Sequence, residues 1–251
     1  MRQLFPGLTV LGATALLWAL VPGEALAQAA TPQATGGPLD TAAVFLTVAL
    51  VPLALVLVTS FAKLAVVFGF LRAGLGLQQV LPTSVLTALA VALSALIMAP
   101  VGLAMTRAAD GLGPDSPRDE LLRRAPEVGA PLGAWLARHA GQPERDALLA
   151  MARELHADAD QARWAAPDHP LVLTTAFALT ELKEAFVIGV LILLPFLILE
   201  VVVANVLLSA GLQGMSPTTV SLPFKILLFV LIDGWTLLVQ GLVMGYTTPT
   251  G

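Results

Sequence analysis

Four apolar stretches of membrane length, which carry ionisable side chains, constrain this sequence more than any other feature. They cover residues 41–71, 84–105, 171–208 and 219–243, and 57% of the chain is hydrophobic while 12% is charged. At about 1.5 Å rise per residue, each stretch could cross a hydrocarbon core of about 30 Å as a helix. The sequence therefore predicts an all-α, membrane-associated protein built from helical hairpins, with four long apolar helical segments.

A polar segment separates the second stretch from the third. Eight of the 13 basic residues, eleven of the 17 acidic residues and all three histidines lie within residues 107–170. Proline and glycine clusters mark the borders of this segment. The predicted organisation is a first apolar helical pair at 41–105, a polar helical domain at 106–170 and a second apolar pair at 171–251.

The N-terminus has the features of an export signal. Arg2 precedes an apolar run at residues 8–20, and the small-x-small pattern of a signal peptidase site follows at residues 25–27. We expect a cleavable signal peptide at 1–27 and a polar N-terminal segment at 28–40. The alternative is a retained first span, although the run is short for one.

Eight ionisable side chains within or beside the apolar stretches need partners, because one such group at a helix centre costs about 2.5–3.5 kcal/mol on insertion scales. They are Lys63, Arg72, Glu181, Lys183, Glu184, Glu200, Lys225 and Asp233.

Spacing limits how these charges can pair. Lys225 and Asp233 are eight residues apart, about 80° around a continuous helix, so their partners must lie on other segments. Glu181 and Glu184 share one helix face and repel unless a cation lies between them. Two interpretations stay open: salt bridges within one four-helix bundle, or ion pairs that also cross between subunits. We favour the second, since one small bundle has little interior for eight charges.

The residue types argue against an enzyme. The chain has no cysteine, no histidine in the apolar stretches and no phosphate-binding G-x-x-x-x-G-K-[ST] motif. The three histidines lack metal-ligand spacing, so no metal or cofactor is expected. A net charge of −4 gives no indication of a nucleic-acid partner.

Four segments resemble the FliP/SctR family of type III secretion export-gate proteins. They are "TSFAKLAVVFGFLRAGLGLQQ" (59–79), "LIMAPVG" (96–102), "ELKEAFVIGVLILLPFLILEVVVANVLL" (181–208) and "MSPTTVSLPFKILLFVLIDGWTLLVQGLV" (215–243). The motifs are more similar to the virulence injectisome branch, whereas the cleavable signal is commoner on the flagellar side. A flagellar subunit of the same family is therefore the alternative.

The resemblance implies a non-enzymatic pore subunit of the bacterial inner membrane, multi-pass and with a periplasmic domain. Its expected partners are further copies in a pentameric ring, two smaller subunits of the S and T (flagellar Q and R) types, and the unfolded proteins that pass through the pore. The competing functions are a solute permease subunit, with the buried charges as its pathway, and a scaffold that anchors the polar domain.

The resemblance also indicates two sites. Where family members carry three methionines, this chain has Leu212, Gln213 and Gly214, followed by Met215. We expect Leu212 and Met215 to form an apolar constriction on a loop kept mobile by Gly214; the alternative is an ordinary turn.

The second site is "ELKEAF", whose Glu181, Lys183 and Glu184 are expected at contacts between adjacent subunits. The alternative is a solvated helix start, where acidic side chains favour the N-terminal dipole.

Overall fold

The structure, a computed structural model, describes residues 49, 54–78, 80–113, 116–155, 166–212 and 214–247, and these residues form helices and no strand. The predicted all-α class is thus confirmed. The chain divides into two units, Met1–Val56 and Leu57–Gly251, and all helices discussed below belong to the second unit. The predicted signal peptide and the polar segment 28–40 lie outside the described residues and stay predictions.

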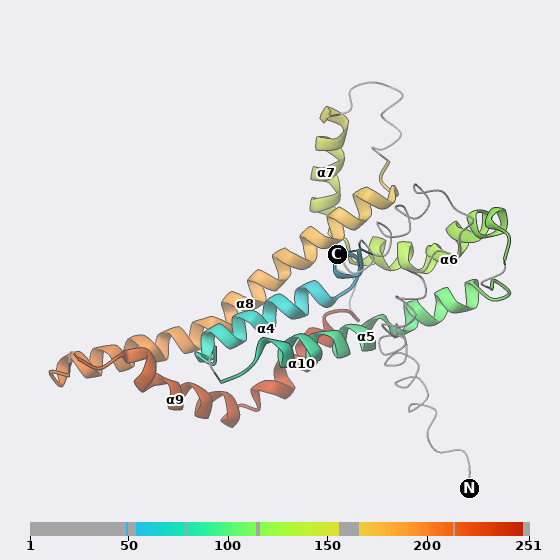
Figure 1. The fold of residues 1–251 in the computed structure, drawn as a ribbon. Coiled ribbons are helices and arrows are strands. Elements are labelled where there is room, and N and C mark those ends of the chain that lie inside the picture. The colour runs from blue at the N-terminus through green and yellow to red at the C-terminus, as the bar shows by residue number, and fades with distance from the viewer. Residues whose placement is uncertain are drawn as a thin grey trace, which may run out of the picture. The chain divides into compact units, whose positions relative to one another are not determined.

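The second unit begins with a hairpin of apolar helices and continues through a polar helical pair into a long apolar helix and a bent helix pair (Figure 1). The helices are α4 (Phe61–Leu75), α5 (Thr83–Ala108), α6 (Arg118–His139), α7 (Gln142–Leu155), α8 (Pro170–Ser209), α9 (Pro217–Leu231) and α10 (Gly234–Met244).

α8 is a single helix of 40 residues, which corresponds to about 60 Å, twice the thickness of a hydrocarbon core. It starts with Pro170 at the first helical position, where the missing N–H is not needed, and the His169 side chain accepts a hydrogen bond from the Leu171 N–H. Its C-terminus is closed by Gly211 in a left-handed conformation (φ 73°). Leu212 N–H then donates to the Leu207 carbonyl at 2.9 Å, as in a Schellman motif.

The prediction of four long apolar helices is not confirmed. Within the described residues, α5 and α8 are each long and apolar enough to span a membrane. The stretch 219–243 is not one helix, because α9 and α10 meet at a 60° bend. The break occurs at Asp233, whose φ of 52° is left-handed and incompatible with a continuing α-helix. The stretch 41–71 lies partly outside the described residues, and its described part contains the start of the 15-residue α4.

The core forms where α4 lies along α8 and against α5 (Figure 1). Leu64, Val67 and Phe68 of α4 are fully buried there. Gly189 of α8 lets the helices approach closely, since a Cβ at this position would overlap the Phe70 ring.

The two polar helices, α6 and α7, fall inside the predicted polar domain 106–170 and pack against the start of α8. α6 follows Pro117, carries acidic residues in its first turn and ends in Arg138 and His139, an arrangement that complements the helix dipole. Trp135 of α6 packs on Phe177 of α8, which joins the polar helices to the apolar part.

Candidate functional site: buried ion pairs and the loop after α8

A buried lysine joins α4 to α8. Lys63 Nζ lies 2.9 Å from Glu181 Oε1 and 2.6 Å from Glu184 Oε2. The Lys63 and Glu181 side chains are only 6% and 2% exposed, whereas Glu184 is 33% exposed. The cation that the two acids of "ELKEAF" require is therefore supplied by α4 of the same chain.

Tyr246, just after α10, completes this cluster. Its hydroxyl donates to Glu181, and Lys63 Nζ lies 4.3 Å from the centre of its ring. Burial, followed by the neighbouring Glu181 carboxylate, raises the pKa of Tyr246, so the phenol stays protonated. Of the described residues, Lys63, Glu181, Glu184 and Tyr246 form what we call the Lys63 cluster.

The third charge of "ELKEAF" points to another partner. Lys183 Nζ donates to Glu144 Oε1 on α7 at 2.8 Å, and this bond holds the pKa of Glu144 below its ordinary value of 4.5. One residue before the motif, Thr180 accepts a 2.9 Å hydrogen bond from the Gly141 N–H between α6 and α7. The motif thus contacts both α4 and the polar helices.

A second ion pair joins α8 to α9. Lys225 Nζ lies 2.5 Å from Glu200 Oε2, and the other oxygen of Glu200 accepts from the Thr218 hydroxyl at 2.6 Å. The Lys225 side chain is 3% exposed and that of Glu200 is 28% exposed. The partner of Lys225 therefore lies on another apolar segment, α8.

The two remaining predicted ions, Arg72 and Asp233, have polar partners rather than oppositely charged ones in the described contacts. Arg72 donates to the backbone carbonyls of Leu81, at 2.8 Å, and Gln78, which fixes the turn between α4 and α5. Asp233 is exposed at the α9–α10 bend and accepts from the Thr236 hydroxyl at 3.0 Å. Arg72 lies in the last turn of α4, from which its guanidinium reaches the turn that follows, and Asp233 lies at the bend between α9 and α10.

Six of the eight predicted ions thus pair within one chain, as the alternative of intrachain salt bridges predicts. That ion pairs also cross between subunits stays a prediction. Because these six charges already have partners within the chain, contacts between subunits need another line of support.

The predicted constriction lies in the loop between α8 and α9. Leu212 and Met215 are 47% and 50% exposed, and Gly214 is exposed as well. Gln213 lies outside the described residues. Among the described residues of this loop, Gly211 has a positive φ and Gly214 does not, so the backbone freedom of glycine is used at the end of α8.

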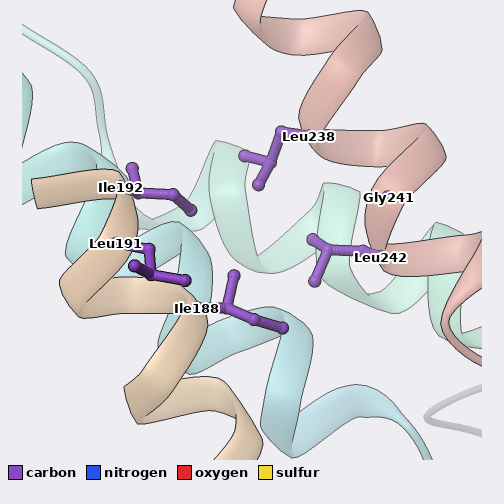
Figure 2. A pocket seen from close by; sticks show the side chains of 6 residues that line it. All are labelled: Ile188, Leu191, Ile192, Leu238, Gly241 and Leu242. Atoms are coloured by element: carbon purple, nitrogen blue, oxygen red, sulfur yellow. The ribbon is translucent and has the colours of Figure 1, made fainter. Parts of the chain in front are cut away.

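An apolar pocket of about 250 Å³ lies between α8 and α10 (Figure 2). Ile188, Leu191 and Ile192 of α8 face Leu238 and Leu242 of α10, and Gly241 lines the pocket between them. No group of three or more acidic, histidine or cysteine side chains that could hold a metal occurs among the described residues.

Comparison with known proteins decides the family. Residues 44–242 match the FliP family. The chain is 39% identical over 202 residues to the hypersensitivity response secretion protein HrcR of Ralstonia nicotianae, covering 79% of this chain and 93% of that protein. It is 40% identical over 202 residues to the Yop proteins translocation protein R of Yersinia pestis, covering 78% and 91%.

This chain belongs to the FliP family. Among its relatives is also the flagellar biosynthetic protein FliP of Caulobacter vibrioides, which is 37% identical over 246 residues, 94% of this chain and 90% of that protein. The FliP-family match includes both ion-pair sites and the loop after α8, and it ends before Tyr246.

The sequence alone did not identify three residues that contact the predicted charges: Glu144, Thr218 and Tyr246. Glu144 was one acid among many in a polar segment, and Thr218 gave no signal. Tyr246 could have been noticed, because it is the single tyrosine of the sequence and lies just beyond the apolar stretch 219–243.

Proposed function

We propose that this chain is a non-enzymatic core subunit of the type III protein secretion export apparatus. Membership of the FliP family over residues 44–242 carries the proposal, since relatives in this family are named as secretion and translocation proteins. The relatives named for virulence functions favour an injectisome, and the flagellar relative keeps the flagellar apparatus as the alternative. Unfolded export substrates are the proposed cargo.

Exposed apolar surface supports a role in an assembly of several copies. Much of α8 and α9 presents large apolar side chains outward, for example Ile198, Val201 and Leu231, which are 63%, 59% and 74% exposed. Contiguous apolar surface of this kind marks contacts with lipid or with other proteins. A pentameric ring that also binds the two smaller S-type and T-type subunits would cover it.

The length of α8 supports a position that is only partly within lipid. At about 60 Å it extends well beyond one hydrocarbon core, so part of it must be covered by protein or water. We propose a multi-pass protein of the inner membrane whose segment 106–170 is periplasmic, with further copies packed along α8.

Co-purification tests the assembly. The tagged chain is expressed with the two small subunits and extracted in mild detergent, and we expect a complex with several copies of this chain, whose mass is measured by native mass spectrometry. A chain that stays monomeric with both partners present would contradict the proposal. Glu184→Gln sharpens the test. If Glu184 also contacts a neighbouring subunit, this variant should lower the yield of the ring while the melting temperature of the isolated chain changes little.

Ion leak tests the loop after α8. We expect Leu212→Ala with Met215→Ala to raise the conductance of the assembled complex in planar bilayers if this loop forms the constriction. Leu208→Ala is the matched control, because Leu208 is 59% exposed but lies on α8 itself. Unchanged conductance in the double variant would assign the loop to an ordinary turn.

A further inference from the structure

The bend between α9 and α10 is formed by two neighbouring residues. Asp233 has φ 52° and ψ 48°, a left-handed conformation that is uncommon outside glycine and that persists only where surrounding contacts hold it. Gly234 follows it and is buried, and a Cβ there would overlap the Phe229 ring of α9. The backbone therefore turns closely around Phe229, and α10 departs from the line of α9 by 60°.

α10 packs on the core of the protomer but leaves space beside α8. Leu242 is 3% exposed and packs with the core residues around Leu64. Toward α8, Leu238 and Leu242 face Ile188 and Ile192 across the pocket of about 250 Å³ (Figure 2). Protein interiors contain few voids larger than a water molecule, and side chains that line a void lose dispersion contacts. α10 is therefore held against α8 less tightly than a fully packed helix would be.

Tyr246 fixes the far end of α10. It follows the helix by two residues, and its hydroxyl donates to Glu181 of α8. Its ring lies 4.3 Å from Lys63 Nζ of α4 and stacks on Trp135 of α6 with the ring centroids 6.0 Å apart. Its carbonyl oxygen lies 3.3 Å from His139 Nε2, a backbone contact that substitutions of the side chain leave in place. The tyrosine side chain thus joins the end of α10 to α4, α6 and α8.

We propose that α10 is a hinged arm, with Asp233 and Gly234 as its hinge and Tyr246 as its latch. While Tyr246 is docked, α10 forms the wall of the pocket that faces α8. When Tyr246 is released, the left-handed backbone at Asp233 loses contacts that hold it, and α10 swings towards the line of α9 and away from α8. The pocket between α8 and α10 then opens.

Both positions of the arm suit apolar surroundings. α9 and α10 taken together are long and apolar enough for one membrane span, so a straighter pair remains compatible with lipid. The pocket is lined by isoleucine, leucine and glycine residues, so its walls can also face lipid once the arm has moved. This inference concerns the fold of one chain and stands whether or not the chain forms an export pore.

The distance between two nitroxide labels, measured by pulsed electron paramagnetic resonance on the full-length protein in detergent, tests the arm. The chain has no cysteine, so Val190→Cys on α8 and Gln240→Cys on α10, both at exposed positions, place one label on each helix. Dilution with unlabelled chain removes distances between copies. Gln240 lies about 10 Å along α10 from the bend, so a swing through the full 60° moves its label by up to about 10 Å.

Variants of Tyr246 test the latch. We expect one distance in the parent, and in Tyr246→Ala a second, longer distance that accounts for most molecules. Tyr246→Phe keeps the ring on Trp135 and removes the hydroxyl bond to Glu181, so it should release a smaller fraction. Thr247→Ala, at the next and exposed position, is the matched control and should give the parent distance.

Variants of Asp233 test the hinge in the Tyr246→Phe background. Asp233→Ala should enlarge the released fraction, because alanine continues a helix and rarely adopts the left-handed conformation. Asp233→Asn should leave that fraction unchanged, because asparagine tolerates this conformation and keeps an oxygen that accepts from the Thr236 hydroxyl.

Three results would overturn the proposal. The first is the parent distance alone in both Tyr246→Ala and the double variant Tyr246→Phe with Asp233→Ala. The second is an equal change for Asp233→Ala and Asp233→Asn. The third is a change in a reference pair, Val190→Cys with Val85→Cys on α5, in the Tyr246→Phe variants, which retain the aromatic ring. In that case Tyr246 holds the whole core together rather than α10.

Discussion

α4 and α9 are both apolar helices of 15 residues with one buried lysine, yet they differ in how many of their apolar side chains are buried with it. α4 buries Lys63 together with its large apolar side chains, of which Leu64 and Phe68 are fully covered. α9 turns Lys225 inward to Glu200 and leaves Leu227 and Leu231 56% and 74% exposed.

This difference shows that apolar composition does not distinguish a core helix from one that needs an apolar environment outside the protomer. α4 completes its packing within the chain, between α8 and α5. α9 buries Lys225 and Phe229 there but leaves most of its other large apolar side chains exposed, and Lys225 is paired because a buried cation without a partner is costly. Its leucines are left for lipid or for other chains, as the proposed assembly requires.

Removing Lys63 should produce the largest loss of stability and so break the packing of α4. Lys63→Ala leaves Glu181 buried, without its cation and 3 residues from Glu184, and breaking a buried pair in this way costs about 3–5 kcal/mol. Denaturant unfolding of the full-length protein in detergent, followed by tryptophan fluorescence, measures the change. A loss below about 1 kcal/mol would mean that the Lys63 cluster is hydrated rather than buried.

The same substitution on α9 should cost less and sharpen the comparison. In Lys225→Ala the released Glu200 keeps its Thr218 bond and can reach water, because its side chain is 28% exposed. We expect a loss of about 1–2 kcal/mol in the same assay. Exchanging the charges, Glu200→Lys with Lys225→Glu, should restore part of it; equal losses for Lys63→Ala and Lys225→Ala would remove the distinction between the two helices.

The sequence predicted helix content, the polar interruption and the ions that need partners, because each follows from local composition and helical spacing. It did not predict the bend at Asp233, since apolar residues continue on both sides and the left-handed turn depends on packing. Nor did it identify Glu200 as the partner of Lys225, because that contact joins residues 25 positions apart on two helices. Six of the eight charges form ion pairs within the chain, so the charges give less support for contacts between subunits than the sequence suggested. The exposed apolar side chains of α8 and α9 are the better indication of assembly.

A polar substitution on the outward face of α9 should leave the protomer nearly unchanged. Leu231→Ser alters a side chain that is 74% exposed, so the free energy of unfolding of the isolated chain should change by no more than about 0.5 kcal/mol. Recovery of the complex with the small subunits should nevertheless fall, as seen by size-exclusion chromatography. Phe68→Ser is the converse variant and should unfold the protomer itself; if Leu231→Ser destabilises the isolated chain as strongly, α9 belongs to the protomer core.

The smallest effect is expected at the ion pair between α7 and α8, which lies outside both helices of the comparison. The pKa of Glu144 is lowered in the folded protein by its bond from Lys183, so the unfolded chain takes up this proton first as the solution is acidified. The stabilisation by the pair is therefore complete above the ordinary pKa of 4.5 and is lost as pH falls through the lower folded value. Thermal melts of the parent and of Lys183→Gln should differ by about two degrees near pH 6 and converge near pH 3, because solvent at the 64% exposed Lys183 weakens the pair even though Glu144 is only 10% exposed. A difference that persists in acid would show that Lys183 stabilises α8 through packing of its aliphatic chain rather than through its charge.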